Sequence, residues 1–80
     1  MTDPGFEFYR TDPRHVSRAV ISRARALLAL YRQGKRVYSR IGQTGYLRIE
    51  AGLRWRLLSK DSGGSWLLMS HQNYDREMKR

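Results

Sequence analysis

The sequence predicts an α+β fold in which a long amphipathic helix packs on a three- to four-stranded antiparallel sheet. Two patterns lead to this prediction. Apolar residues recur at helical spacing over residues 13–33, and apolar and polar residues alternate over residues 46–71, where glycines mark the turns. The chain has 80 residues and is 40% hydrophobic with two Trp and five Tyr, so we expect one small domain, residues 1–80, with one core.

The first elements are predicted from capping signals. Residues 1–12 are expected to be irregular or to form a short strand over residues 5–10. Asp12 followed by Pro13 is typical of a helix start, and Gly34 is typical of a helix end, so we place the helix at residues 13–33. Its apolar side is expected to comprise Val16, Val20, Ala24, Leu27 and Tyr31.

The sheet is predicted over residues 37–71, with a first strand at 37–41 and three further strands after residue 45. A three-residue turn at residues 51–53 would place Ile49 opposite Trp55 with both side chains on the core face. A four-residue loop at 61–64 would place Leu57 opposite Leu68. Residues 73–80 are expected to form a polar tail of one or two helical turns.

The charge balance favours a polyanionic partner. Sixteen Lys and Arg against seven Asp and Glu give a net charge of +9. The chain lacks cysteine, and its two histidines have no carboxylate cluster beside them, so we expect neither a metal site nor a cofactor. We find no apolar run of signal or membrane-spanning length and therefore expect a cytoplasmic protein that does not bind a membrane.

The predicted open face of the sheet carries the candidate site. Arg48, Arg54 and Arg56 alternate with core residues, and His71 comes at the end of the last strand. Guanidinium groups beside an imidazole suit RNA phosphate, because arginine binds two phosphate oxygens and histidine transfers protons near neutral pH. The ribose 2′-hydroxyl can then serve as the nucleophile without a metal. Tyr74, three residues later, could stack on a base or assist proton transfer.

Three less specific interpretations stay open for these residues. Arg48 and Arg54 could form ordinary cross-strand pairs with Glu50, His71 could bond the backbone, and Tyr74 could anchor the tail by packing. Other cations are also candidates for RNA binding. Arg18 and Arg25 belong to a stripe on the polar side of the helix, which could equally be a solvated face, and Lys60 follows an apolar strand.

The last half of the chain resembles the RelE/ParE toxin superfamily of bacterial toxin–antitoxin systems. The order of an Arg-bearing strand, a glycine turn, an aromatic-Arg-Leu strand and a final apolar strand is matched by 47–49, Gly52, 55–57 and 66–69. Residues 70–75, read as SHQNYD, are similar to the His-x-x-Tyr-Asp ending of HigB-like members. Members usually carry a pair of helices before the sheet, where this chain is predicted to have one.

The resemblance implies an activity and partners. It implies a type II toxin that cuts mRNA without a metal in the ribosomal A site and that a cognate antitoxin neutralises in the bacterial cytoplasm. Arg48 and Arg56 would bind phosphate, His71 would act as acid or base, and Tyr74 would support the substrate. The alternative is a ParE-like inhibitor of DNA gyrase, or a basic binding module on the same fold.

Overall fold

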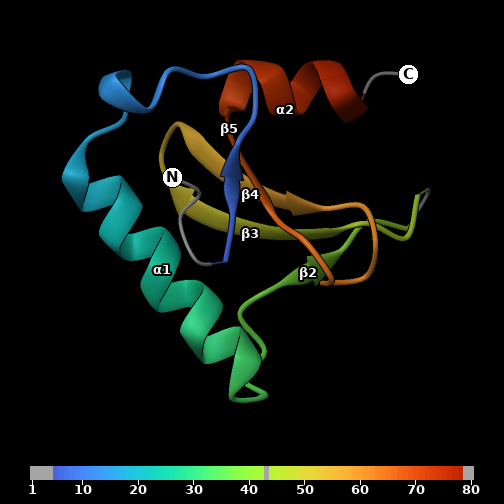
Figure 1. Ribbon diagram of the computed structural model, residues 1–80. Helices are drawn as coiled ribbons and strands as arrows, with labels where there is room; N and C mark the ends of the chain where they lie inside the picture. Colours follow the sequence, from blue (N-terminus) through green and yellow to red (C-terminus); the bar gives the residue numbers. More distant parts are fainter. Residues whose placement is uncertain (1–4, 43, 79–80) are drawn as a thin grey trace.

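The computed structural model describes residues 5–42 and 44–78 and places a helix on each face of a mixed sheet (Figure 1). The elements in chain order are β1 (Glu7–Phe8), a 3₁₀ turn (Pro13–His15), α1 (Arg18–Arg32), β2 (Ser39–Arg40), β3 (Leu47–Gly52), β4 (Trp55–Ser59), β5 (Leu67–Ser70) and α2 (His71–Met78). An α+β fold is therefore confirmed, although several of its details differ from the prediction.

The sheet has five strands in the order β1-β5-β4-β3-β2. The prediction of three or four antiparallel strands was wrong because β1 joins the sheet in parallel with β5. The amides of Glu7 and Tyr9 donate to the carbonyls of Trp66 and Leu68, each at 2.9 Å. Two segments from opposite ends of the chain thus lie side by side, a pairing that local sequence patterns do not report.

The predicted helix over residues 13–33 is divided into two. Asp12 caps only a 3₁₀ turn, by accepting from the Arg14 amide at 2.9 Å. Val16 is extended and buried, and Ser17 then caps α1 by accepting from the Val20 amide at 3.3 Å. The helix ends where predicted, at Gly34, whose φ of +89° lets the chain turn back in a Schellman motif.

The β3–β4 register also differs from the prediction. Ile49 lies opposite Leu57 rather than Trp55, because the register shifts between Glu50 and Gly52. The turn therefore contains two residues, Leu53 and Arg54, rather than three. The predicted partner of Ile49 is wrong by two residues along β4. Because side chains alternate with a period of two, Ile49 still faces the core. The β4–β5 register, with Leu57 opposite Leu68, is as predicted.

Apolar clusters lie on both faces of the sheet. The larger cluster lies between the sheet and α1 and includes Ala24, Leu28, Leu47, Ile49, Ala51, Leu57, Trp66 and Leu68. On the other face, Leu58, Met69 and Tyr74 form a second buried cluster beneath α2. The predicted open face is therefore partly covered, because residues 71–78 form a helix that folds back over β4 and β5.

Candidate functional site

The candidate histidine lies where β5 passes into α2 without a loop. His71 is the first residue of α2 rather than the last residue of a strand. Its amide donates to the carbonyl of Arg54 at 2.7 Å. This bond joins the start of α2 to the β3–β4 turn and so brings the exposed side chains of His71 and Arg54 to the same end of the sheet.

The imidazole of His71 has a carboxylate partner within its own helix. Its Nε2 lies 3.2 Å from Oδ2 of Asp75, one helical turn later, and both side chains remain about half exposed. A carboxylate on one ring nitrogen orients an imidazole and fixes which nitrogen carries the proton. Asp75 was not predicted as a site residue. Residues four apart face each other on a helix, so the spacing of Asp75 from His71 could have indicated the pair. The prediction placed His71 at the end of a strand, where this spacing has no such meaning.

A hollow of about 600 Å³ opens beside this pair. It is lined by Arg54, Trp55, Ser70, His71 and Gln72. The hollow thus combines a guanidinium, an imidazole, a hydroxyl, an amide and the face of a half-buried indole. Such a set could bind an anion and transfer a proton beside it.

Arg48 and Tyr74 contact each other, but neither side chain lines this hollow. The Arg48 guanidinium donates to the Tyr74 hydroxyl at 3.5 Å and lies 6.0 Å from the centre of its ring. It also lies 3.9 Å from the Glu50 carboxylate. Tyr74 is buried against Leu58 and Met69, so its ring belongs to the second apolar cluster.

Arg56 forms hydrogen bonds with the backbone of its own hairpin, β3–β4. Its Nη1 donates to the carbonyls of Gly52 at 2.9 Å and Trp55 at 3.0 Å. Its partner on β3 is Glu50. Arg56 lines a different hollow from His71, one of about 360 Å³ that also includes Arg23 and Leu53.

Lys60, predicted to bind RNA, lies in an aromatic and acidic setting. Its Nζ is 3.3 Å from Oε2 of Glu77 and 5.9 Å from the ring centres of both Tyr9 and Tyr46. Its side chain is nevertheless partly exposed. The contacts indicate that this cation helps to fasten the end of α2 to the sheet.

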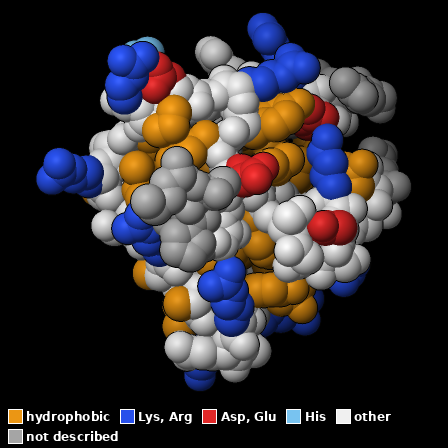
Figure 2. All heavy atoms as spheres, viewed as in Figure 1, with side chains coloured by type: hydrophobic (Ala, Val, Ile, Leu, Met, Phe, Trp, Pro, Cys, Tyr) orange, Lys and Arg blue, Asp and Glu red, His pale blue; other side chains and the backbone are white. Residues whose placement is uncertain are grey.

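Arg18 and Arg25 lie on the exposed side of α1, around a small hollow of about 280 Å³ shared with Ile21 and Ser22. His71 lies on the other helix. In the face shown in Figure 2, Lys and Arg side chains are scattered in separate groups, at the edge and over the middle of the view, with apolar side chains visible between them. On that face, then, the basic residues do not merge into one patch.

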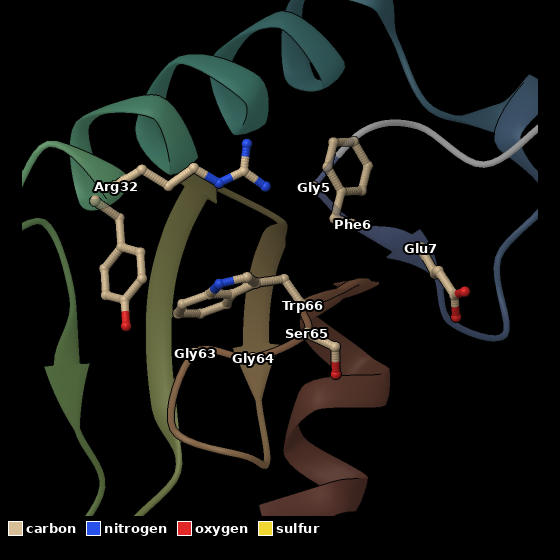
Figure 3. Close-up of a pocket in the computed structure, with 9 residues that line it drawn as sticks. Gly5, Phe6, Glu7, Arg32, Gly63, Gly64, Ser65 and Trp66 are labelled. Atoms are coloured by element: carbon tan, nitrogen blue, oxygen red, sulfur yellow. The ribbon is translucent and has the colours of Figure 1, made fainter.

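Another hollow, of about 610 Å³, contains none of the predicted site residues (Figure 3). It lies between the end of α1, the start of β1 and the β4–β5 loop, at the end of β5 remote from His71. Arg32 extends into this region, and Trp66 lies below it. The loop amides of Gly63, Gly64 and Ser65 donate to Ser59 and Asp61. Because those amides are engaged, the loop does not offer an anion-binding nest.

Within the described residues, no group of three or more His, Cys, Asp or Glu side chains could hold a metal ion. Likewise, no helix in the described part of the chain is long and apolar enough to cross a membrane.

A model of the ParE-like toxin domain matches residues 18–76, from the start of α1 into α2. The chain belongs to the ParE-like toxin domain family. This finding confirms the predicted relation to the RelE/ParE superfamily and implies a toxin with a cognate antitoxin. Comparisons with curated proteins and with solved structures give no significant match. The matched ParE-like segment contains α1, β2 to β5 and α2 as far as residue 76, and therefore all the candidate site residues.

Proposed function

We propose that this ParE-like protein is a toxin that cleaves mRNA, with His71 transferring protons and Arg54 binding the scissile phosphate. The observation that carries the proposal is the shared hollow, in which an exposed imidazole, oriented by Asp75, lies beside an exposed guanidinium. Charge and positioning are the main requirements of this reaction, because RNA supplies its own nucleophile.

The reaction is an internal transfer at phosphorus. A base takes the proton of the ribose 2′-hydroxyl, the 2′-oxygen bonds to phosphorus, and the bond from phosphorus to the 5′-oxygen breaks. The products are a 2′,3′-cyclic phosphate and a 5′-hydroxyl, whose proton comes from an acid. The contact with Asp75 uses Nε2 of His71, so Nδ1 is the nitrogen through which we expect the proton to move.

The contacts of the other candidates support indirect roles. Arg48 is bonded to Tyr74 and so joins β3 to α2, whereas Arg56 is bonded to two backbone carbonyls of the β3–β4 hairpin. Within the proposal, Arg54 is the primary phosphate ligand and Arg48 and Arg56 position the elements that carry it. The mRNA would be met in the ribosomal A site.

Inhibition of DNA gyrase is the second candidate. It is favoured by the family match, which is to the ParE-like domain, and by the engagement of Arg48, Arg56 and Lys60 in contacts within the fold. A toxin that acts by binding needs no proton-transfer group. For such a protein, His71 and Asp75 would simply stabilise the first turns of α2.

The test is induced expression of the wild type, His71→Gln, Asp75→Asn and Arg54→Gln, with mapping of mRNA 5′ ends and a gyrase supercoiling assay in parallel. His15→Gln is the matched control, since His15 is exposed in the 3₁₀ turn. We expect His71→Gln to lower cleavage by about 10² to 10⁴. Full cleavage by a folded His71→Gln protein would remove histidine from the mechanism. Toxicity with intact mRNA and blocked supercoiling would establish the gyrase alternative.

A further inference from the structure

The fold uses its two tryptophans in different ways. Trp66 is 3% exposed and contacts the Tyr31 ring edge to face, with 5.3 Å between ring centres. Trp55 is only half-buried, since it packs against the cluster between the sheet and α1 and also lines the hollow that contains His71. Within the described residues, no other ring and no cation lies over the Trp55 indole. Part of this aromatic surface is therefore open to a ligand.

The open indole is fixed close to the groups proposed for the chemistry. Trp55 lies opposite Ser70 across β4 and β5, and His71 follows Ser70 directly. The carbonyl of Arg54, the residue before Trp55, accepts from the His71 amide at 2.7 Å. A guanidinium, an indole and an imidazole thus project from two backbone segments that hydrogen bonds hold together. A ligand that contacted all three would not have to order this backbone first.

The lining of the hollow suits a nucleotide of a single strand. It provides one exposed cation, Arg54, an imidazole, and neutral polar groups at Ser70 and Gln72, and it includes no carboxylate. The Asp75 carboxylate contacts the other side of the chemistry, at Nε2 of His71, and does not line the hollow. Single-stranded nucleic acids are bound where cations meet the phosphates and aromatic rings stack on the bases. Both groups are present here, next to each other.

We propose that Trp55 stacks on a base of the bound strand and makes this hollow a site for unpaired nucleotides. Arg54 would hold the phosphate beside that base, which brings the phosphate to His71. The identity of the strand as mRNA rests on the proposed function, whereas the stacking itself does not require cleavage. Because every base has an aromatic face, the contact selects single strands over duplexes rather than one sequence. Single-stranded DNA should bind as well, without being cut, since it lacks the 2′-hydroxyl.

Two other uses of the indole are less well supported. Packing against the core accounts for the buried part of Trp55 but not for its open part. An acidic peptide could pair with Arg54, yet other exposed arginines, such as Arg18 and Arg32, offer it the same ion pair. The ring beside Arg54 is what sets this hollow apart, and a flat base covers a ring more fully than a carboxylate does.

The test uses a short single-stranded oligodeoxynucleotide, which the proposed reaction cannot cleave. In a matched strand, abasic residues replace the nucleotides, so the phosphates stay and the bases are absent. Both strands carry fluorescein and are titrated by anisotropy, at one low salt concentration, against the wild type, Trp55→Leu, Trp55→Phe and Tyr38→Leu. Tyr38→Leu is the control, because Tyr38 is a partly buried aromatic residue outside the hollow.

We expect the wild type to bind the base-bearing strand about tenfold to a hundredfold more tightly than the abasic strand. Trp55→Leu should lose this difference and bind the abasic strand like the wild type, whereas Trp55→Phe should keep most of it, since a phenyl ring also stacks. Unlabelled strand should quench the tryptophan emission of the wild type but not that of Trp55→Phe, whose remaining Trp66 is buried. Tyr38→Leu should behave like the wild type.

Three results would overturn the assignment of Trp55 to base stacking. These are a wild type that does not distinguish the two strands, an equal loss with Tyr38→Leu, and equal quenching by the annealed duplex. Quenching by a Glu-rich peptide but not by the strand would assign the hollow to an acidic protein instead. If Trp55→Leu does not fold, the two strands on the wild type and the emission of Trp55→Phe still give the answer. Stacking without RNA cleavage would remove the proposed reaction alone, and cleavage without stacking would remove this role of Trp55 alone.

Discussion

Lys60 Nζ lies 3.3 Å from Glu77 Oε2, and this contact joins the end of β4 to the last turn of α2. The Glu77 side chain is only 9% exposed and also accepts a hydrogen bond from the Tyr9 hydroxyl. One shielded carboxylate therefore connects the segment after β1, the end of β4 and the C-terminal helix. A carboxylate in such a position is costly to leave unpaired.

The first prediction concerns this connection. Glu77→Gln should lower the free energy of unfolding by about 1 to 3 kcal/mol, because the charged acceptor of Tyr9 and Lys60 is lost. Lys60→Met should cost less, since its cation is partly exposed and can be replaced by solvent. Urea unfolding monitored by tryptophan fluorescence measures both. Lys35→Met, at an exposed lysine after α1, is the control and should leave the unfolding midpoint unchanged.

A second prediction separates packing from chemistry at Tyr74. Its ring is buried with Leu58 and Met69, whereas its hydroxyl makes a long contact, of 3.5 Å, with Arg48. Tyr74→Ala should cost about 3 to 5 kcal/mol of stability, and Tyr74→Phe about 1 kcal/mol or less. If Tyr74→Phe keeps its stability but loses cleavage by tenfold or more, the hydroxyl takes part in the reaction.

The two tryptophans should differ in their importance for stability. Trp66 is 3% exposed and contacts Tyr31 edge to face, with 5.3 Å between ring centres, whereas Trp55 is half-buried beside the His71 hollow. Trp66→Ala should therefore cost about 3 to 5 kcal/mol, and Trp55→Ala clearly less. The sequence-based register placed Trp55 on the core face, and equal losses in thermal unfolding would mean that Trp55 contributes as much to stability as Trp66.

The β4–β5 loop gives a prediction about pH. The pKa of Asp61 is lowered from its ordinary value of 3.8, first by the Ser65 amide and then by the Ser59 and Ser65 hydroxyls that donate to it. A lowered pKa in the folded state means that the stabilisation is full above pH 3.8 and is lost as pH falls through the folded value. The difference in urea midpoint between the wild type and Asp61→Asn should thus shrink below pH 3.8. Glu50→Gln, at an exposed carboxylate, tests whether the effect is general.

The inner face of the sheet was predictable because side-chain alternation survives an even shift in register. Ile49 and Leu57 face the core even though their partners were assigned two residues away. The end of α1 at Gly34 was predictable because the chain turns there with a positive φ, a conformation that favours glycine. The start of α1 was not predictable, because Asp12 and Ser17 are both good helix caps. In the structure Val16, which lies between them, is extended and buried, so α1 begins after Ser17.

The candidate site was predicted in part. The alternation placed Arg48 and Arg56 on the face opposite the core, but local patterns do not show that α2 folds over that face. Tyr74 therefore became a buried partner of Arg48 instead of a group facing the substrate. The pairing of His71 with Asp75 depends on α2 beginning at residue 71, which the strand-like sequence before it concealed.

The parallel pairing of β1 with β5 has a consequence for the timing of folding. These two strands lie near opposite ends of the chain, so their contacts close a loop that contains nearly all of it. Such pairings are slow to form, and a nascent chain cannot make them until β5 has been synthesised and has left the ribosome. His71 follows β5 directly, so the surface proposed for toxicity is assembled only after β5 has emerged and paired with β1.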